Sequence, residues 1–301
     1  MPFDAIIIGG SFAGLSAALY LARARRRVLV VDAGSPRNRF ASASHGFFGQ
    51  DGRDPLAMIA EARTQLRAYP GVVFLNAKVS AVEPHPAGFA VSWEGGSETG
   101  TRLLLATGVV DQLPALPGLR ERWGTSVLHC PYCHGFEFSD ARIGVLGMGP
   151  ISLHQALMLS DWGPTTLFTD GRVPLDDEAR AKLKARAVTV VEGAVIGLEG
   201  EGPALSGVAL SKGGVVPVSA LFIGAPVTMA APFAASLGCA FDDTPLGPII
   251  RVGADKQTTV AGVYAAGDAA RMPHSVAFAV ADGAMAGIAM HQAGVTAAST
   301  H

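Results

Sequence analysis

The chain has 301 residues, of which 49% are hydrophobic, 16% are charged and 37 are glycine. This composition is typical of a packed α/β protein with room for two domains, and it excludes an intrinsically disordered chain. A formal net charge of −2 gives no electrostatic reason to expect nucleic acid or an anionic membrane as a partner.

The N-terminal segment predicts the first βαβ unit of a dinucleotide-binding fold. Residues 5–8 form an apolar strand, residues 9–14 (GGSFAG) a glycine turn and residues 13–25 a helix. Residues 28–31 form a second strand that ends at Asp32. Glycines in this position let the backbone approach a pyrophosphate, and the carboxylate of Asp32 is placed to accept hydrogen bonds from a ribose. An ordinary glycine turn is the alternative, because Ser11 stands where the G-x-G-x-x-G pattern has its middle glycine.

The same segment must be weighed as an export or membrane signal. Residues 5–22 form a run of 18 residues without a charged side chain. This length is the lower limit for a helix that spans a membrane. Because glycines interrupt the run and Asp4 rather than a basic residue leads into it, a buried strand and helix explain it better. We therefore expect a cytoplasmic protein.

The rest of the chain predicts a second unit and a return to the first. Strands are expected at residues 72–75, 89–93 and 103–105, and prolines at 114 and 117 flank a linker. A second βαβ unit follows, with strands at residues 143–146 and 165–168 around a helix at residues 152–159. The chain closes with a strand end at residues 262–268 and a helix at residues 275–291. Asp268 offers a carboxylate for the ribityl chain of a flavin, although this corner could be any strand–helix junction.

Three cysteines are too few for a secreted scaffold held by disulfides. Cys130 and Cys133 lie in the segment HCPYCH (residues 129–134), while Cys239 stands alone and is predicted to be a small buried side chain. A C-x-x-C pair can form a redox-active disulfide, bind zinc, attach haem or be a buried structural pair. A zinc site would need two more ligands, and the sequence has no second C-x-x-C or H-x-x-H motif. Attachment of a c-type haem requires export of the protein. The proline between the two cysteines is typical of redox motifs and favours a redox-active disulfide.

His134 directly follows the second cysteine. Because the unperturbed pKa of histidine lies near working pH, His134 could take a proton from a substrate thiol. A solvated loop histidine is the alternative.

Residues 147–152 (GMGPIS) resemble a second dinucleotide turn in which Ser152 replaces the last glycine. The strand after the helix leads to Asp170, whose carboxylate would repel the 2′-phosphate of NADPH, and only Arg172 is close. The turn therefore makes NADPH doubtful, and it leaves open whether NADH binds or the turn is only architectural.

Together these segments resemble the thioredoxin reductase-like flavoproteins, the low-molecular-weight branch of the pyridine nucleotide–disulfide oxidoreductases. The resemblance covers the whole chain and rests on residues 8–18, residues 106–108, the C-x-x-C and residues 266–268. It implies an α/β fold of two Rossmann-like, three-layer ββα-type nucleotide-binding domains, the second inserted in the first. The FAD domain would comprise residues 1–113 and 241–301, and the inserted NAD(P)H-type domain, residues 114–240, would carry the cysteines. It also implies a homodimer.

The resemblance further implies roles for individual residues. Cys133 would lie nearer the isoalloxazine and form the charge-transfer thiolate, while Cys130 would exchange with substrate. The residues implied to contact FAD are Gly9, Gly10, Ser11, Gly14, Asp32, Gly108, Gly267 and Asp268.

Two departures from ordinary thioredoxin reductases matter. Those proteins have Asp directly after the second cysteine, where this chain has His134, and paired arginines where it has TDG at residues 169–171. Both departures, and the run CPYCHGFE at residues 130–137, resemble the dithiol oxidases related to gliotoxin and holomycin biosynthesis. Those enzymes oxidise a small-molecule dithiol and return electrons from flavin to oxygen without NADPH.

We therefore expect an FAD-dependent dithiol oxidase with Cys130, Cys133 and His134 as catalytic residues and without a metal. One alternative is an NAD(P)H-dependent disulfide reductase that acts on a thioredoxin-like protein. A non-catalytic, flavin-bound redox sensor is the other.

Overall fold

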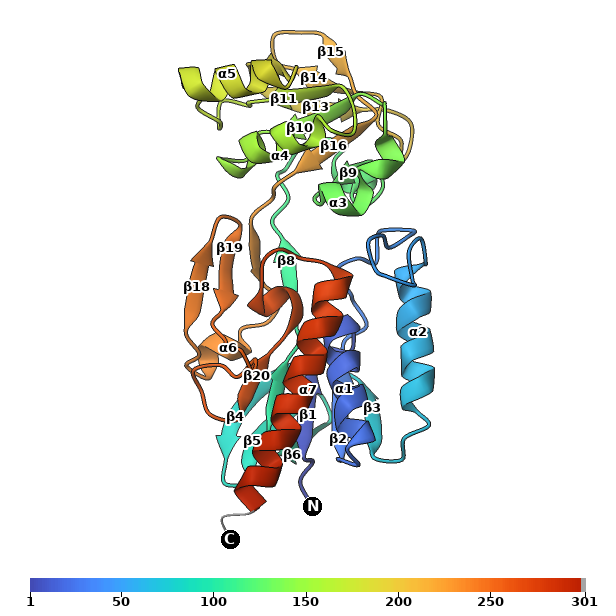
Figure 1. Cartoon of the computed structure of the whole chain (residues 1–301), viewed down its shortest axis with the longest axis vertical. Coiled ribbons are helices and arrows are strands. Elements are labelled where there is room, and N and C mark those ends of the chain that lie inside the picture. The colour runs from blue at the N-terminus through green and yellow to red at the C-terminus, as the bar shows by residue number, and fades with distance from the viewer. Residues whose placement is uncertain (299–301) are drawn as a thin grey trace.

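The computed structural model describes residues 1–298, and Figure 1 shows two α/β units placed end to end. The first unit is built from both ends of the chain and the second from the stretch between them. None of the helices in the described part is long and apolar enough to cross a membrane.

A five-stranded parallel sheet forms the centre of the first unit, in the order β20-β7-β1-β2-β3. Its strands are β1 (Ala5–Ile8), β2 (Val28–Asp32), β3 (Val72–Asn76), β7 (Leu103–Leu105) and β20 (Val263–Ala265). Every residue of β1 is buried, as expected for a parallel strand that is covered on both faces. Because β20 comes from the far end of the sequence, this sheet is complete only after the chain returns from the second unit.

Alternate side chains of the first sheet enter two separate hydrophobic clusters. Ile6 and Ile8 pack with Val82 and Val91 of an antiparallel sheet, whereas Ile7 packs with the helices on the other face. The antiparallel strands are β4 (Val79–His85), β5 (Gly88–Trp93) and β6 (Gly96–Gly100), and the helices are α1 (Phe12–Arg23), α2 (Pro55–Leu66) and α7 (Val276–Ala298). This is the expected three-layer arrangement.

The second unit repeats the three layers. Its parallel sheet has the order β12-β11-β10-β16-β9, with helices on one face and a second antiparallel sheet on the other. The parallel strands are β9 (Val127–Leu128), β10 (Ile143–Leu146), β11 (Thr165–Phe168), β12 (Thr189–Val191) and β16 (Ala220–Ile223). The remaining elements are η1 (Arg120–Arg122), α3 (Pro131–His134), η2 (Phe136–Phe138), α4 (Ile151–Leu159), α5 (Asp177–Ala185), β13 (Val195–Glu199), β14 (Gly207–Leu210) and β15 (Val215–Pro217).

Two short strands connect the units. β8 (Val109–Asp111) leaves the first unit, β17 (Val227–Met229) returns to it, and the two pair in antiparallel fashion. The elements after the return are α6 (Phe233–Ser236), β18 (Phe241–Thr244), β19 (Gly247–Ile250) and η3 (Gly267–Ala270). Phe233 and Cys239 pack in the cluster that contains Ile6. Their packing favours a boundary at β17, ahead of the one expected after residue 240.

Cys239 is a buried free thiol, as predicted, and only 6% of it is exposed. Its Sγ–H donates to Thr258 Oγ1 at 3.4 Å.

The predicted elements are present with small shifts at their ends. α1 ends at Arg23 rather than residue 25, because Arg25 adopts a left-handed conformation with φ of 60°. α7 extends beyond the expected residue 291 to Ala298. α2 was not predicted, although Asp54 accepts hydrogen bonds from two backbone N–H groups of its first turn and Pro55 occupies its first position. These are the usual sequence signs of a helix start.

α1 and α7 pack so closely that a Cβ on Gly283 would lie 2.1 Å from the carbonyl oxygen of Ala13. We predict that Gly283→Ala lowers the free energy of unfolding by about 1–3 kcal/mol, the usual cost of overpacking, as measured by urea denaturation. Gly294→Ala in the same helix is the control, because its Cβ would meet only the flexible end of Arg102 at 3.2 Å. Helix propensity should leave that variant equally stable or more stable. Equal losses in both variants would contradict the packing argument.

Candidate active site

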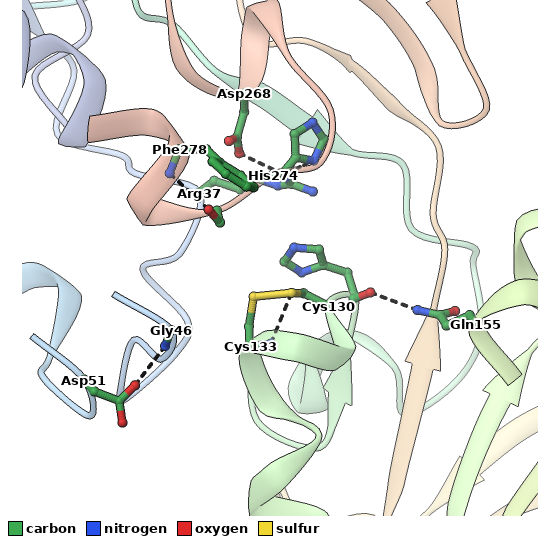
Figure 2. The surroundings of a disulfide bond; sticks show 11 residues. Arg37, Gly46, Asp51, Cys130, Cys133, Gln155, Asp268, His274 and Phe278 are labelled. Carbon is green, nitrogen blue, oxygen red and sulfur yellow. Dashed lines mark hydrogen bonds and ion pairs between the residues drawn. A yellow bond between two sulfur atoms is a disulfide. The ribbon is translucent and has the colours of Figure 1, made fainter. Parts of the chain in front are cut away.

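The structure joins Cys130 and Cys133 in a disulfide, drawn in Figure 2. Cys130 directly precedes α3, and Pro131 takes the first helical position, where a missing N–H leaves no bond unmade. The N–H of Cys133 donates to Cys130 Sγ at 3.2 Å. The ring of Tyr132, which is 75% exposed, lies 5.8 Å from that of Trp162. The cysteine pair is thus held in the first turn of a short helix.

A cavity of about 1130 Å³ extends from the disulfide along the first unit. Cys133 and His134 line it, whereas Cys130, also among the described residues, does not. The cavity wall contains most of the residues expected to contact FAD, namely Gly9, Gly10, Ser11, Asp32, Gly108, Gly267 and Asp268. Gly14 lies behind the wall, where a Cβ would stand 1.9 Å from the carbonyl oxygen of Gly9. Glycine is therefore needed at position 14 for α1 to pack against the turn.

The first glycine turn and its surroundings fit FAD. Gly9 has φ of 108°, and a Cβ there would lie 2.2 Å from the carbonyl oxygen of Ala106, so no other residue leaves the turn as open. The cavity wall carries five basic side chains and three acidic ones, an excess that suits a doubly charged pyrophosphate. Two buried nitrogens in that wall, Arg63 Nε and His274 Nε2, have no hydrogen-bond partner within residues 1–298.

Asp32 ends β2 as predicted and is held by Arg63 of α2. Arg63 Nη2 donates to the Asp32 carboxylate and, at 3.4 Å, to the carbonyl oxygen of Gly10. The guanidinium also lies 5.6 Å from the ring of Phe74. Arg63 thus orients the Asp32 carboxylate and leaves its second oxygen available to a ribose hydroxyl.

Arg37 connects distant segments in the cavity wall. Its Nε donates to Asp111 at the end of β8 at 2.9 Å, and its Nη2 donates to the other oxygen of that carboxylate. Its Nη1 donates to Asp268 of η3 at 2.8 Å and to His274 Nδ1 at 2.7 Å. Figure 2 shows Arg37, Asp268 and His274 above the disulfide, and these three residues and Cys133 all line the cavity. The guanidinium charge is therefore paired with two carboxylates.

Three histidines of the cavity wall have lowered pKa values, and burial is the largest cause for each. Burial and the nearby charge of Arg37 lower the pKa of His129 to about 3. Burial also lowers the pKa of His134, although Glu137 opposes it, and His45 adds to the decrease. At His274, burial and Arg37 outweigh the opposing effect of Asp268 on the pKa. All three imidazoles are therefore mainly neutral at pH 7.

The polar side chains in and near the second glycine turn, residues 147–152, form hydrogen bonds to other groups of the protein. Ser152 Oγ donates to the Leu146 carbonyl oxygen at 3.2 Å and accepts from the Met148 N–H at 2.9 Å. Asp170 accepts from the Val195 N–H at 2.8 Å and lies 3.3 Å from Arg172. The two hydrogen bonds of Ser152 therefore stabilise the turn. The Asp170 carboxylate lies just beyond the end of β11. The wall of the large cavity does not include this turn.

Residues 3–283 match the family described as pyridine nucleotide-disulphide oxidoreductase. The chain belongs to this family. Among solved structures, the oxidoreductase from Agrobacterium tumefaciens is 47% identical, with a TM-score of 0.94 over 98% of this chain and 99% of that one. HlmI is 36% identical, with a TM-score of 0.91 over 99% and 95% of the two chains. Among curated relatives, "Thioredoxin reductase tcpT" of Claviceps purpurea (strain 20.1) is 34% identical, and the match covers 94% of this chain and 92% of that protein.

These findings confirm the family expected from the sequence. They also support the assignment of this protein as an FAD-dependent disulfide oxidoreductase. Its C-x-x-C disulfide lies beside the cavity.

Several residues in the site of this disulfide oxidoreductase were not predicted. His129 adjoins Cys130, and its position alone could have marked it for the cavity wall. Arg63 lies on α2, a helix that the sequence analysis did not predict. No local sequence feature marks Arg37 or His274 as residues of the site, because they are 237 residues apart and come together only in the folded protein.

The lowered pKa of His129 predicts a loss of stability in acid. The unfolded imidazole takes up its proton near pH 6.5 and the folded one near pH 3. The contribution of His129 to the free energy of unfolding is therefore complete above pH 6.5. It falls as the pH drops towards 3, by up to about 1.4 kcal/mol per pH unit. We predict that His129→Gln makes this decline shallower in urea denaturation between pH 4 and 7. His85→Gln, at an exposed histidine, is the control, and an unchanged slope in His129→Gln would refute the assignment.

Proposed function

We propose that the protein oxidises a small-molecule dithiol to a disulfide and passes the electrons through FAD to oxygen or another acceptor. The observation that carries this proposal is that Cys133 of the disulfide lines a cavity suited to FAD, with neutral histidines beside it. A cytoplasmic location belongs to the same proposal, because a disulfide in a reducing compartment is usually catalytic rather than structural.

Thiol–disulfide exchange would oxidise the substrate. One substrate sulfur attacks Cys130 Sγ, and the Cys130–Cys133 bond breaks to leave Cys133 as a thiolate. The second substrate sulfur then displaces Cys130, which leaves as a thiol with one of the two substrate protons, so that the substrate loses two electrons and two protons and the cysteine pair gains both electrons. His134 lines the cavity beside Cys133 and, being neutral, accepts a proton from a substrate thiol. FAD, when bound, would supply the chemistry that takes both electrons from the cysteine pair and delivers them to the terminal acceptor.

The second glycine turn supports oxidation rather than reduction by NADPH. The carboxylate of Asp170 stands where a 2′-phosphate would have to bind and would repel it. A neutral ribose would not meet this repulsion, so NADH stays compatible. Reduction of a thioredoxin-like protein by NAD(P)H is the second candidate, favoured by the name of the relative from Claviceps purpurea. A flavin-bound redox sensor is the non-enzymatic alternative.

We also propose a homodimer formed through α7. Five exposed residues of this helix follow one another in steps of three and four, at Phe278, Ala281, Met285, Ile288 and Gln292, and Val295 and Thr296 are exposed near its end. This spacing is the one that joins helices in a coiled coil. Figure 1 shows α7 on the outside of the first unit, with this helix not covered by another element in that view. An apolar stripe of this kind on a helix surface marks an interaction site.

The direction of the reaction is tested by anaerobic flavin bleaching. We expect a small dithiol to bleach the FAD-loaded protein and NADPH to leave it coloured, with hydrogen peroxide formed when air is admitted. Cys133→Ser should keep FAD but reduce turnover by a factor of about a thousand or more, whereas Cys239→Ser should turn over normally. Rapid bleaching by NADPH with transfer to thioredoxin would establish the reductase instead. Binding of a protein partner that depends on the disulfide, without any turnover, would favour the sensor.

The α7 interface is tested by sedimentation velocity. We expect the wild type to sediment at twice the chain mass of 30.9 kDa and Ile288→Glu to sediment as a monomer, because a buried unpaired charge is costly. Ile196→Glu, at an exposed apolar residue of the second unit, should remain dimeric. A wild-type monomer, or a dimer that survives Ile288→Glu together with Met285→Glu, would exclude this interface.

A further inference from the structure

The cavity wall contains more basic side chains than its own carboxylates can pair. All three carboxylates are occupied, because Arg63 binds Asp32 and Arg37 binds both Asp111 and Asp268. The basic side chains of the wall that have no carboxylate partner in residues 1–298 are Arg39, Lys78 and Arg120. These three cations are available to an anionic ligand.

Two of these cations border the cavity where the two units meet. The guanidinium of Arg39 stacks on Phe40, 4.2 Å from the centre of the ring. Phe40 in turn lies against Gly124 so closely that a Cβ on this glycine would be 2.6 Å from the Cβ of Phe40. The N–H of Trp123, directly before Gly124, donates to the carbonyl oxygen of Arg120 at 3.4 Å. Arg39 of the first unit and Arg120 of the second therefore reach the cavity from neighbouring segments.

The junction region of the cavity comprises Arg39, Phe40, Arg120, Trp123, Gly124 and His129. It adjoins the disulfide, because the ring of His129 lies 6.1 Å from that of Trp123 and His129 directly precedes Cys130. Cys133 and His134 line the same cavity. Figure 1 shows the segment between β2 and α2, which carries Arg39 and Phe40, beside α3. A molecule bound in the junction region can therefore reach the redox-active cysteines.

The pyrophosphate of FAD has other partners than the junction region. The glycine turn at residues 9–14, which suits the pyrophosphate, begins at the end of β1. Lys78 follows β3 of the same parallel sheet, so that it belongs to the same edge of the sheet as the turn. Arg120 belongs to η1 of the second unit. A pyrophosphate on the turn thus uses backbone N–H groups and Lys78, and it leaves Arg39 and Arg120 to another anion.

We infer that the junction region binds the substrate of the proposed oxidation and that Arg39 and Arg120 pair with a carboxylate of this substrate. The inference rests on the proposed function and narrows its substrate class to small dithiols that carry a carboxylate. Binding of the carboxylate orients the dithiol end of the substrate towards the disulfide.

The chemistry of the junction region suits such a substrate. A guanidinium presents its donors in a planar fork that matches both oxygens of a carboxylate, and a charge-assisted hydrogen bond is stronger than a neutral one. Arg39 donates from Nη1 to the carbonyl oxygen of Pro36 at 2.9 Å, and its remaining N–H groups have no partner in residues 1–298. The side chain of Arg120 makes no hydrogen bond within the same residues. The rings of Phe40 and Trp123 provide an apolar wall for the carbon chain.

The test compares dihydrolipoate with dihydrolipoamide, two dithiols that differ only in a carboxylate against a neutral amide. We expect dihydrolipoate to reduce the flavin of the FAD-loaded protein with a second-order rate constant at least about ten times that of the amide, without oxygen and at low salt. Arg39→Gln combined with Arg120→Gln should lower this ratio to less than about a third of its wild-type value. Arg142→Gln combined with Lys212→Gln changes the net charge equally outside the cavity wall and should keep the ratio. A smaller wild-type ratio, or an equal loss in both double variants, overturns the inference.

Binding without turnover separates this inference from the proposed reaction. The disulfides lipoate and lipoamide cannot reduce the protein, and titration calorimetry gives their affinities for the oxidised, FAD-loaded wild type. We expect lipoate to bind at least about tenfold more tightly, with an advantage that shrinks as salt is added. This preference without flavin reduction by either dithiol would retain the carboxylate site and reject the proposed oxidation. A smaller difference in affinity overturns the inference. Loss of FAD from the double variant of Arg39 and Arg120 also overturns it, because both arginines would then belong to the cofactor site.

Discussion

The antiparallel pairing of β8 with β17 determines where the disulfide lies, because these strands carry the chain into the second unit and back. The segment between β2 and α2 also makes contacts with β8 and with the residues that follow α3. Arg37 binds Asp111 at the end of β8, and His45 lies 3.3 Å from Glu137 beside the redox helix. These contacts hold Cys133 in the cavity wall. Chemistry between Cys133 and a bound flavin depends on this geometry rather than on either unit alone.

The site separates fixed charge from proton transfer. The permanent positive charge of Arg37 is matched by Asp111 and Asp268, and burial keeps the neighbouring imidazoles neutral. A neutral imidazole can take up a proton, whereas a permanently protonated one could not. Exchange between sulfur atoms requires a thiolate, so a base without charge beside Cys133 suits a substrate that arrives as a neutral thiol.

The parts of the fold that follow from local patterns could be predicted from the sequence. The β1-turn-α1-β2 unit was visible because apolar periodicity, the glycines and Asp32 lie within one short segment. The same holds for the cysteine pair and for the carboxylate at Asp170. Asp268 was predicted, but its partners Arg37, Asp111 and His274 could not be, because they come from different segments and meet only after the sheet has formed. Residues 233–239 have no sequence feature that assigns them to either unit, whereas Phe233 and Cys239 pack in the cluster of the first unit, and a boundary at β17 is therefore proposed.

Cys239 has a consequence for the durability of the enzyme. Exchange between thiols and disulfides does not discriminate among sulfur atoms, and any third thiol within reach can intercept a half-exchanged cysteine and form a dead-end bridge. Cys239 lies buried in the hydrophobic cluster of the first unit, hydrogen-bonded to Thr258. The folded chain therefore offers an incoming dithiol one reactive pair, and repeated turnover in excess substrate cannot scramble its sulfur connectivity without unfolding the first unit.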